Sequence, residues 1–526
     1  MDILKLDLNK ETPDLAGEGE IRFQVGLLAA IATVVVSFVA RFAFGAPLIP
    51  ELMAQFIFLV APLWMVEIAV GLLGPFAKHL GFLGCTVLYL LALIAAAIGY
   101  LRFAPRQNSV RSRYVLPIAF GLLVWIFSGL ALIPVMGGGL FGSHLQQGVL
   151  FTALSSLAVN VVYGLAIGLA AARYIYRDAE QKIAASDVIS RRRVIRAAGY
   201  AVLAVGVFDI VKSLFGSWWF SGGGRVKRGD GVFPNINNLA LEITPTSDFY
   251  QVSKNAFDPE VDVRRWKLDV AGLVDNPLSM TLDEIKSLPS IEQYATLVCI
   301  SNEVGGDLIG TAKWKGVRLK DVLERAGVQQ GVVDIVFRAS DDYADSISLD
   351  RAMTEGTLLV YEMNGQPLTT EHGFPIRLLS PGIYGMKNVK WITKLEAVNF
   401  DFKGYWQRRG WDDRAENKTL SRIDVPDGKV TGETTIAGIA FAGDRGVSKV
   451  EVSVDGGTNW EATEIKSPLS RYTWVLWQKM WKPEKKGSHR LVVRATDGRG
   501  QIQTSQYAPP TPDGSSGYQS VTVKSD

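Results

Sequence analysis

Six long apolar stretches in the first 220 residues constrain the fold of this 526-residue chain more than any other feature. Each is close to the roughly 20 residues that an α-helix needs to cross the apolar core of a bilayer. We place them at Phe23–Gly45, Met53–Leu73, Leu80–Leu101, Val115–Val135, Val149–Ile175 and Ala197–Trp218. The sequence after Phe220 has the mixed composition of a soluble protein. We therefore expect a transmembrane helical domain over residues 1–220, followed by soluble domains.

The positions of Lys and Arg beside these stretches predict how the bundle is oriented, because such residues gather in cytoplasmic loops. They lie after the third stretch, and at the end of the fifth stretch and after it. They comprise Arg102, Arg106, Arg111, Arg113, Arg173, Arg177, Lys182, Arg191, Arg192, Arg193 and Arg196. The loop Phe141–Gln147 has none, and the N-terminal tail is rich in Asp and Glu. The chain is thus expected to begin outside, cross the cell membrane six times, and place its soluble part on the extracytoplasmic side.

The segment Ser190–Arg196 (SRRRVIR) lies directly before the sixth stretch. It resembles a twin-arginine export signal, placed inside the chain instead of at its start. The alternative interpretation is a basic anchor at a helix entrance. The export interpretation is favoured if the following domain folds around a cofactor in the cytoplasm before it crosses the membrane.

Histidine and cysteine usage limits the redox groups that the chain can hold. The four histidines are His79, His144, His372 and His489, and none falls in the middle of a predicted span, so a membrane haem is not expected. The two cysteines, Cys85 and Cys299, exclude a disulfide framework and are too few for an iron–sulfur cluster. A net charge of +3 gives no reason to expect nucleic-acid binding.

The soluble part separates into two patterns after a Gly-, Arg- and Lys-rich linker, assigned to residues 221–242. Residues 243–425 alternate strands and short helices, such as a strand over Trp266–Leu273 and a capped helix over Thr281–Leu288, which is typical of an α+β domain. Residues 426–526 contain only strand patterns, for example Lys449–Val454, separated by Asp-Gly turns. This pattern predicts an immunoglobulin-like β-sandwich.

Six motifs in the soluble part occur together in one order. They are Thr296–Asn302 (TLVCISN), Tyr361–Leu368 (YEMNGQPL), His372–Arg377 (HGFPIR), Pro381–Gly385 (PGIYG), Asn388–Trp391 (NVKW) and Tyr405–Arg409 (YWQRR). In this order the motifs resemble the sulfite oxidase family, which are mononuclear molybdenum enzymes with a pyranopterin cofactor. The similarity runs from about Ile243 to the end of the chain, since residues 426–526 resemble the family's dimerisation domain.

The resemblance implies roles for individual residues. Cys299 would be the thiolate ligand of molybdenum, a metal that thiolates suit, although a lone cysteine is more often a buried free thiol. The implied cofactor contacts are Tyr250, Lys254, Asn255, Asn302, Asp341, His372, Arg377, Asn388, Val389 and Lys390. The implied substrate pocket contains Tyr343, Arg408 and Arg409.

One segment departs from the family pattern. Sulfite oxidases carry arginine just after the Cys-x-x-Asn element, whereas this chain has Glu303–Gly306 (EVGG) there. An acidic residue near the metal disfavours an anionic substrate. The departure therefore bears on which substrate is expected, but it does not change the cofactor that is expected.

Three functions follow from these features. The first is a membrane-anchored molybdenum oxidoreductase that transfers an oxygen atom and exchanges electrons with a separate partner, such as a cytochrome or a quinone-linked protein. The second is a reductase of S-oxides or N-oxides with the same cofactor. The third is a non-enzymatic membrane scaffold on a decayed molybdenum fold. A homodimer through the C-terminal domain is compatible with each.

Overall fold

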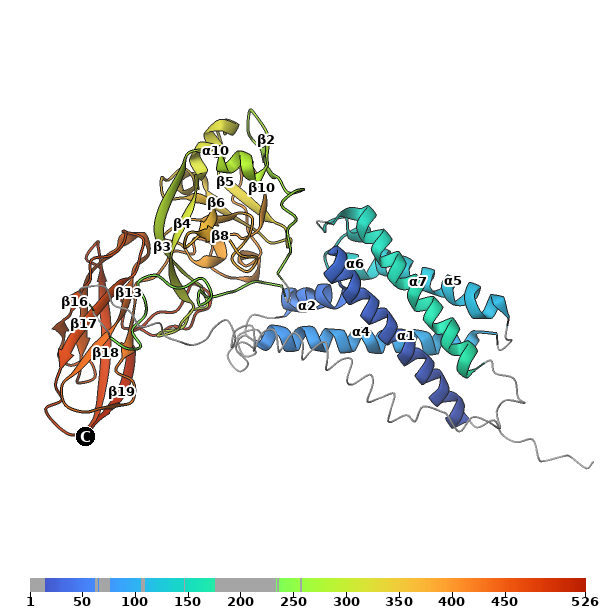
Figure 1. The fold of residues 1–526 in the computed structure, drawn as a ribbon, viewed down its shortest axis with the longest axis horizontal. Helices are drawn as coiled ribbons and strands as arrows, with labels where there is room; N and C mark the ends of the chain where they lie inside the picture. Colours follow the sequence, from blue (N-terminus) through green and yellow to red (C-terminus); the bar gives the residue numbers. More distant parts are fainter. Residues whose placement is uncertain are drawn as a thin grey trace, which may run out of the picture. The chain divides into compact units, whose positions relative to one another are not determined.

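A computed structural model describes residues 15–61, 65, 76–105, 109–145, 147–175, 233, 236–255 and 258–526 (Figure 1). The chain divides into two compact units, Met1–Leu214 and Phe215–Asp526, and each is described by itself.

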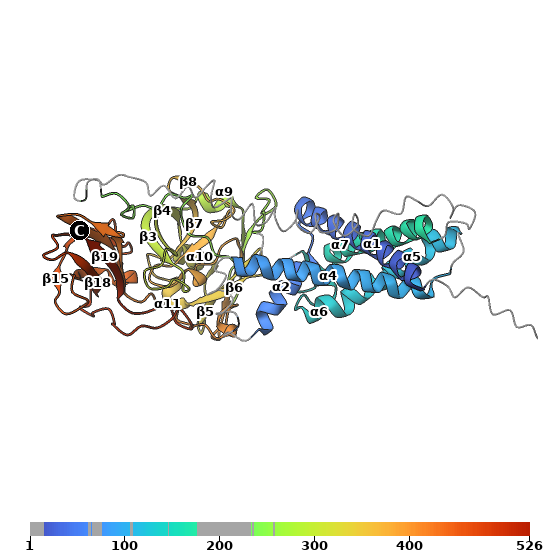
Figure 2. The same ribbon diagram turned by 90° about the horizontal axis from the view of Figure 1, so that it is seen from below.

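The first unit is helical. Its elements are α1 (Leu15–Phe44), α2 (Ile49–Val60), α4 (Phe76–Phe103), η1 (Arg111–Val115), α5 (Leu116–Phe127), η2 (Ser128–Leu132), α6 (Ile133–Val135), η3 (Leu140–Gly142) and α7 (Gly148–Tyr174). Among the residues that the structure describes, four helical segments are long and apolar enough to cross a membrane, namely Glu18–Phe44, His79–Phe103, Arg111–Val135 and Gly148–Tyr174. They run alongside one another in Figure 2 and coincide with the first, third, fourth and fifth predicted stretches.

The second predicted stretch differs from this expectation. Helix α2 has 12 residues and is about 18 Å long, whereas the apolar core of a bilayer is about 30 Å thick. Ala61, which follows α2, has an extended backbone. The physical reason is Pro62, because a proline disfavours the helical conformation of the residue before it. Residues 62–64 and 66–75 lie outside the described part of the chain.

Helices α1 and α4 are antiparallel. The backbone of Gly26 lies against Ile94 and Ala97, while the rings of Phe38 and Phe82 are 6.1 Å apart near the other end. The start of α1 and the end of α4 therefore lie at the same end of the bundle. If the second stretch crossed the membrane between them, α1 and α4 would be parallel. The structure therefore corrects the expectation that each of the first three stretches crosses the membrane in turn.

Other sequence expectations lie outside the described residues. These are the sixth stretch Ala197–Trp218, the twin-arginine-like segment Ser190–Arg196, and the first part of the linker, residues 221–232.

The second unit begins with an α+β domain built on two sheets. One sheet has the order β2-β1-β10-β5-β6 and is mixed, because β1 pairs with β10 in parallel and the other pairs are antiparallel. The second sheet has the order β3-β4-β7-β8, with β9 paired to β7. The strands are β1 (Leu268–Gly272), β2 (Leu278–Met280), β3 (Ser290–Val298), β4 (Ile309–Arg318), β5 (Asp334–Ala339), β6 (Ala344–Ser348), β7 (Leu358–Met363), β8 (Gln366–Pro367), β9 (Arg377–Leu379) and β10 (Ile392–Val398).

Short helices join these strands. They are α9 (Leu282–Lys286), α10 (Leu319–Ala326), α11 (Leu349–Ala352), η5 (Gly385–Lys387) and η6 (Gln407–Arg409). Thr281 and Glu284 form a reciprocal capping box at the start of α9, which confirms the predicted capped helix.

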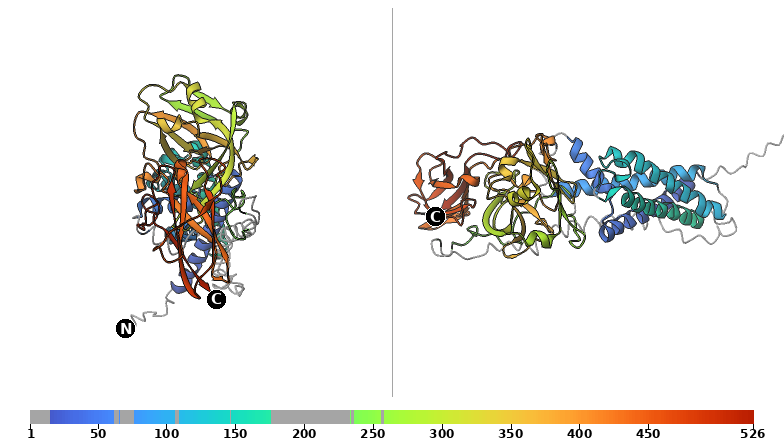
Figure 3. Two further views of the ribbon diagram at one scale, coloured as in Figure 1. Left: turned by 90° about the vertical axis from the view of Figure 1, so that its left-hand side faces the viewer. Right: turned by 90° about the horizontal axis from the view of Figure 1, so that it is seen from above.

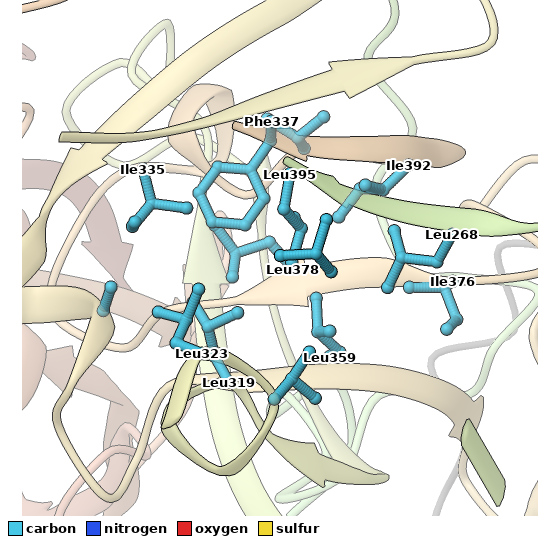
Figure 4. Close-up of a cluster of buried hydrophobic side chains, with 14 of the residues drawn as sticks. Leu268, Leu319, Leu323, Ile335, Phe337, Leu359, Ile376, Leu378, Ile392 and Leu395 are labelled. Carbon is cyan, nitrogen blue, oxygen red and sulfur yellow. The ribbon is translucent and has the colours of Figure 1, made fainter. Parts of the chain in front are cut away.

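The main core of this domain joins the two sheets. Leu268, Phe337 and Leu395 come from the mixed sheet, and Leu359 and Leu378 from β7 and β9; all are less than 1% exposed. Figure 4 shows these side chains converging with Leu319 and Leu323 of α10. Strands β5, β7 and β9 are buried along almost their whole length, so the side chains on both of their faces are covered by neighbouring elements.

The C-terminal domain consists of two further sheets, ordered β11-β13-β17-β16 and β12-β19-β18-β14-β15. Their strands are β11 (Leu420–Val425), β12 (Lys429–Val430), β13 (Thr434–Phe441), β14 (Val447–Ser453), β15 (Glu461–Ala462), β16 (Glu464–Ile465), β17 (Val475–Trp481), β18 (Gly487–Asp497) and β19 (Gln519–Ser525). Both sheets contribute to one core around the fully buried Trp477. Figure 3 shows these strands in orange to red.

Residues 236–242, assigned to a linker from the sequence, are packed onto this C-terminal domain. Leu239 belongs to its core. The Ala240 amide donates to Asp424 Oδ2 at 3.0 Å, and Trp474 Nε1 donates to the Glu242 carbonyl at 3.1 Å. The apolar Leu239–Leu241 run explains the docking, because exposing it would leave apolar surface in water.

Candidate functional site

Cys299 lies directly after β3, at the start of a closed loop. Its amide donates to the Leu308 carbonyl at 2.9 Å, and the Asn302 amide donates to the Cys299 carbonyl at 3.0 Å. Asn302 Oδ1 accepts from the Leu308 amide at 2.8 Å. The thiol is free and 6% exposed. Burial raises the pKa of the Cys299 thiol, and hydrogen bonds from the amide and hydroxyl of Ser301 oppose that effect.

Two tyrosines, the partly buried Tyr250 and the buried Tyr384, interact with this thiol. Burial raises the pKa of Tyr250, the charge of Cys299 adds to the rise, and Arg377 opposes it. Burial also raises the pKa of Tyr384 to about 12, again with a contribution from Cys299. Tyr384 was not predicted as a site residue, although it belongs to the quoted Pro381–Gly385 motif; its burial of 4% exposure depends on long-range packing.

Arg377, the first residue of β9, is a buried cation. It is 5% exposed, and it donates to the carbonyls of His372 at 3.2 Å and Asn388 at 3.3 Å. Its Nε atom is buried without a hydrogen-bond partner. Within the described ranges, no carboxylate forms an ion pair with it. Burial lowers the pKa of Arg377 to about 10, so it remains a cation at neutral pH.

His372 is also buried, with 2% exposure. Its Nε2 lies 2.9 Å from the Thr246 carbonyl, and this nitrogen must carry the proton because a carbonyl only accepts. Burial lowers the pKa of His372 to about 4. The imidazole is therefore neutral at pH 7 and offers a hydrogen-bonding group, whereas Arg377 offers charge.

Lys390 and its neighbours complete this side of the site. Lys390 Nζ donates to the Glu371 carbonyl at 2.9 Å and lies 4.1 Å from the ring centroid of Trp391. Asn388 uses its Oδ1 to accept from the Ser380 amide at 2.6 Å, which leaves its backbone to face Arg377. Val389 is buried.

A second group of predicted residues forms a continuous hydrogen-bonded network. Lys254 Nζ donates to Asn255 Oδ1 at 2.7 Å, and Asn255 Nδ2 donates to Asp341 Oδ2 at 3.2 Å. Asp341 Oδ1 accepts from the Tyr343 amide at 3.1 Å. The structure thus brings together four predicted residues that lie up to 89 positions apart, from Lys254 to Tyr343.

The hydroxyl of Tyr343 is already engaged inside the protein. It lies 3.0 Å from Asp345 Oδ2 and 2.8 Å from the Met386 carbonyl. Asp345 is fully buried and pairs with Lys387 at 3.1 Å. Burial first, and then the charge of Asp345, raise the pKa of Tyr343 well above its ordinary value.

Arg408 and Arg409 lie beside this network but differ in burial. Arg408 is exposed and donates to the Lys403 carbonyl at 3.2 Å. Arg409 is partly buried, with its Cζ 3.4 Å from the ring centroid of Tyr405, and its Nε has no hydrogen-bond partner. Burial lowers the pKa of Arg409.

The two groups meet at the turn η5. A Cβ atom added to Gly385 would lie 2.5 Å from the Tyr250 hydroxyl, and the next residue, Met386, accepts from Tyr343. Glycine is needed at position 385 because any side chain would displace Tyr250. Trp411, which was not predicted, packs against the cluster that contains the neighbours of Cys299. Its place two residues after Arg409 gave no sign of this.

The segment Glu303–Gly306 lies in the loop that follows Cys299. Glu303 is exposed, and its carbonyl accepts from the Gly306 amide at 2.9 Å. Its side chain brings a negative charge to the loop that follows Cys299.

Comparison with known proteins identifies two matching family models. Residues 255–406 match the oxidoreductase molybdopterin binding domain, and residues 417–508 match the Mo-co oxidoreductase dimerisation domain. The chain is 34% identical to mouse mitochondrial sulfite oxidase over 319 residues, covering 51% of this chain and 58% of the mouse protein. It is 31% identical to chicken sulfite oxidase, covering 52% of this chain and 71% of the chicken protein. The chain thus spans little more than half of the mouse relative.

Among solved structures, the sulfane dehydrogenase SoxCD from Paracoccus pantotrophus matches with a TM-score of 0.50 at 22% identity. The match covers 58% of this chain and 90% of that chain. At this level of identity it supports the fold alone.

The residues present fit a molybdenum–molybdopterin cofactor. A buried guanidinium with an unused Nε atom requires an anion to offset its desolvation, and a phosphate group meets that need through two parallel hydrogen bonds. Arg377 supplies this group, while Cys299 supplies a buried sulfur ligand with no disulfide partner. The donor set is therefore of the kind that a phosphate-bearing molybdenum cofactor requires.

Proposed function

Because the chain belongs to the sulfite oxidase family of molybdopterin-dependent oxidoreductases, we propose that it is a membrane-anchored enzyme whose catalytic domain faces the extracytoplasmic side. The single observation that carries the proposal is that one domain holds both a buried free thiol, Cys299, and a buried cation, Arg377, whose Nε has no hydrogen-bond partner and which forms no ion pair among the described residues. A scaffold without a cofactor would have no use for an uncompensated buried charge.

The bound cofactor would supply oxygen-atom transfer and two-electron chemistry. Cys299 would hold the metal, and Arg377 would neutralise the phosphate of the cofactor. His372 and the Asn388–Lys390 backbone would orient the pterin. Lys254, Asn255 and Asp341 would hold its other side through their shared network, and Asn302 would keep the Cys299 loop closed. Tyr250 would contribute a neutral hydroxyl.

Substrate binding is assigned to the side of the site that carries Tyr343, Arg408 and Arg409. Arg409 has an unused buried donor, so it would bind an oxyanion. Tyr343 would position substrate through its network with Asp345, because its hydroxyl is held and neutral. For sulfite, the balanced reaction consumes one water and yields sulfate, two protons and two electrons.

The orientation in the membrane combines the structure with the charge of its loops. Arg102, Arg111 and Arg113 lie at the end of the bundle where α1 begins, so cytoplasmic basic loops would place the N-terminus in the cytoplasm. Four crossings then return the chain to the cytoplasm after α7. A fifth crossing by Ala197–Trp218 would deliver the catalytic domain outside.

The remaining assignments extend this proposal. The domains would be a transmembrane helical domain (1–220), a linker that begins at residue 221, an oxidoreductase domain that begins at residue 243, and an immunoglobulin-like domain that supports a homodimer. The last of these would include β11, because β11 pairs with β13. Electrons would pass to a separate partner, a cytochrome or a quinone-linked membrane protein. The twin-arginine-like Ser190–Arg196 would serve export of a domain folded around its cofactor.

A second candidate function is reduction of S-oxides or N-oxides. Glu303 favours it, because a carboxylate beside the metal loop repels a sulfite dianion but not a neutral oxide.

Turnover assays on the purified full-length protein distinguish these functions. Sulfite-dependent reduction of ferricyanide would support the oxidase. Oxidation of a reduced dye that depends on an S-oxide or N-oxide would support the reductase. Protein that contains molybdenum but performs neither reaction would refute both substrate classes.

A further inference from the structure

The loop that follows Cys299 is held from outside by the C-terminal domain. Ser515 Oγ donates to the Asn302 carbonyl at 2.7 Å, and Arg422 Nη1 donates to the Gly306 carbonyl at 2.9 Å. Between these points, a Cβ atom added to Gly305 would lie 2.7 Å from the amide nitrogen of Gln519. The loop therefore makes close contacts with the C-terminal domain near both of its ends.

The strand before Cys299 is held by the same domain. The Thr296 amide donates to the Tyr472 carbonyl at 2.9 Å, and Thr296 Oγ1 accepts from the Trp474 amide at 2.9 Å. Ser470 Oγ donates to the Tyr294 carbonyl at 2.6 Å. Contacts on both sides of Cys299 thus come from residues more than 115 positions away in sequence.

Arg422 is rigidly placed for this contact. Its Nε lies 2.6 Å from Asp424 Oδ1, and the two side chains are 15% and 8% exposed. The other oxygen of Asp424 accepts from the Ala240 amide at 3.0 Å. The carboxylate of Asp424 therefore holds both Arg422 and the segment around Ala240. A guanidinium held in this way loses little conformational freedom when it binds a carbonyl.

We propose that Arg422 is a positioning residue that, by holding the Gly306 carbonyl, keeps the Cys299 loop closed and the sulfur oriented for the metal. The role of Arg422 in orienting the sulfur for the metal rests on the proposed function. The hydrogen bond from Arg422 to the Gly306 carbonyl is independent of that function. It gives the C-terminal domain a role within a single chain, in addition to the dimerisation for which its family model is named.

The test uses full-length protein in detergent with the background substitution Cys85→Ser, so that Cys299 is the one remaining cysteine of the two in the sequence. Arg422→Ala is expected to speed alkylation of Cys299 by iodoacetamide in cofactor-free protein about fivefold, the factor that one lost hydrogen bond gives. In the holoenzyme it should shift or broaden the Mo(V) paramagnetic signal, which reports the orientation of the thiolate. Arg422→Lys should restore part of both effects.

Arg494→Ala is the matched control, since Arg494 lies in the same domain, is 22% exposed and pairs with Glu451 at 2.9 Å. It should leave alkylation and the Mo(V) signal unchanged. Ser515→Ala, which removes one hydrogen bond from the C-terminal domain to the same loop, provides a second variant if Arg422→Ala does not fold.

Wild-type alkylation rates and an unchanged signal in both Arg422→Ala and Ser515→Ala would overturn the proposal. Wild-type protein without molybdenum would instead refute the proposed function, and the alkylation rates would still decide whether Arg422 holds the loop.

Discussion

The guanidinium of Arg377 lies over the indole ring of Trp314, with 5.3 Å between Cζ and the ring centroid. This cation–π contact, together with two backbone carbonyls, is the stabilisation that the described part of the protein offers to a charge with 5% exposure. Such a buried charge is expected to bind an anion. Replacing Arg377 should therefore affect the binding of the cofactor and the stability of the protein differently.

Arg377→Met is therefore predicted to leave the stability of cofactor-free protein unchanged or increased, while molybdenum content after purification falls severely. Replacing an uncompensated buried charge by an apolar side chain of similar size removes a desolvation cost. The comparison is Arg445→Met, because Arg445 pairs with the buried Asp497 at 2.8 Å. Breaking that pair should cost about 3 kcal/mol, measured by urea unfolding. Equal destabilisation by both substitutions would contradict the assignment of Arg377.

His372 predicts how stability depends on pH. Its pKa in the folded protein is about 4, below the ordinary 6.5, so the unfolded chain binds more protons between these values. Stability is then complete above pH 6.5 and falls as the pH is lowered toward 4, by on the order of 3 kcal/mol in total. Urea unfolding between pH 4 and 7 should show this slope in wild-type protein and in a His489→Gln control. A His372→Gln variant that keeps the full slope would refute the prediction.

The antiparallel arrangement of α1 and α4 predicts that the N-terminus and the loop after Phe103 lie on the same side of the membrane. Single cysteines introduced at residue 5 and at residue 107, in a background without the native cysteines, should be labelled from the same side by a membrane-impermeant maleimide. Six alternating crossings would require labelling from opposite sides.

The segment Ser190–Arg196 predicts the route of export. Arg191→Lys together with Arg192→Lys should retain the soluble unit in the cytoplasm, because twin-arginine recognition does not accept lysine at both positions. Replacing the nearby Arg173 and Arg177 by lysine keeps the positive charge and serves as the control. Protease protection of the C-terminal domain in spheroplasts measures the outcome, and normal external delivery of the double variant would show that the segment is a basic anchor.

Local sequence signals predicted the local structure well. The Thr281–Glu284 capping box is readable from four consecutive residues, and the β1 strand from the alternation of residues 266–273. The α+β domain and its cofactor class were predictable because six motifs occur in one order. These features depend on neighbours in the sequence, or on chemistry that the cofactor imposes.

Long-range features were not predictable in the same way. The docking of Ala240 onto Asp424 joins residues 184 positions apart, and the local sequence around Ala240 resembles a linker. The end of α2 could have been predicted from Pro62, which lies in the middle of the apolar stretch. The hydropathy pattern alone does not show it, because the residues on both sides of Pro62 are apolar. The close approach of α1 to α4 occurs at Gly26, where an added Cβ would lie 3.3 Å from that of Ala97, and this contact joins residues that are far apart in the sequence.

The central claim is that Cys299 holds a redox-active molybdenum. Electron paramagnetic resonance of the oxidised full-length protein tests it most directly, before and after addition of sulfite, with dithionite as a second reductant and Cys299→Ser and Cys85→Ser as paired variants. A Mo(V) signal in wild-type and Cys85→Ser protein that is lost or altered in Cys299→Ser is predicted, and its appearance with sulfite would also establish the direction of the reaction. A signal with dithionite alone would favour the reductase. The absence of any signal and of molybdenum from the wild-type protein would contradict the claim.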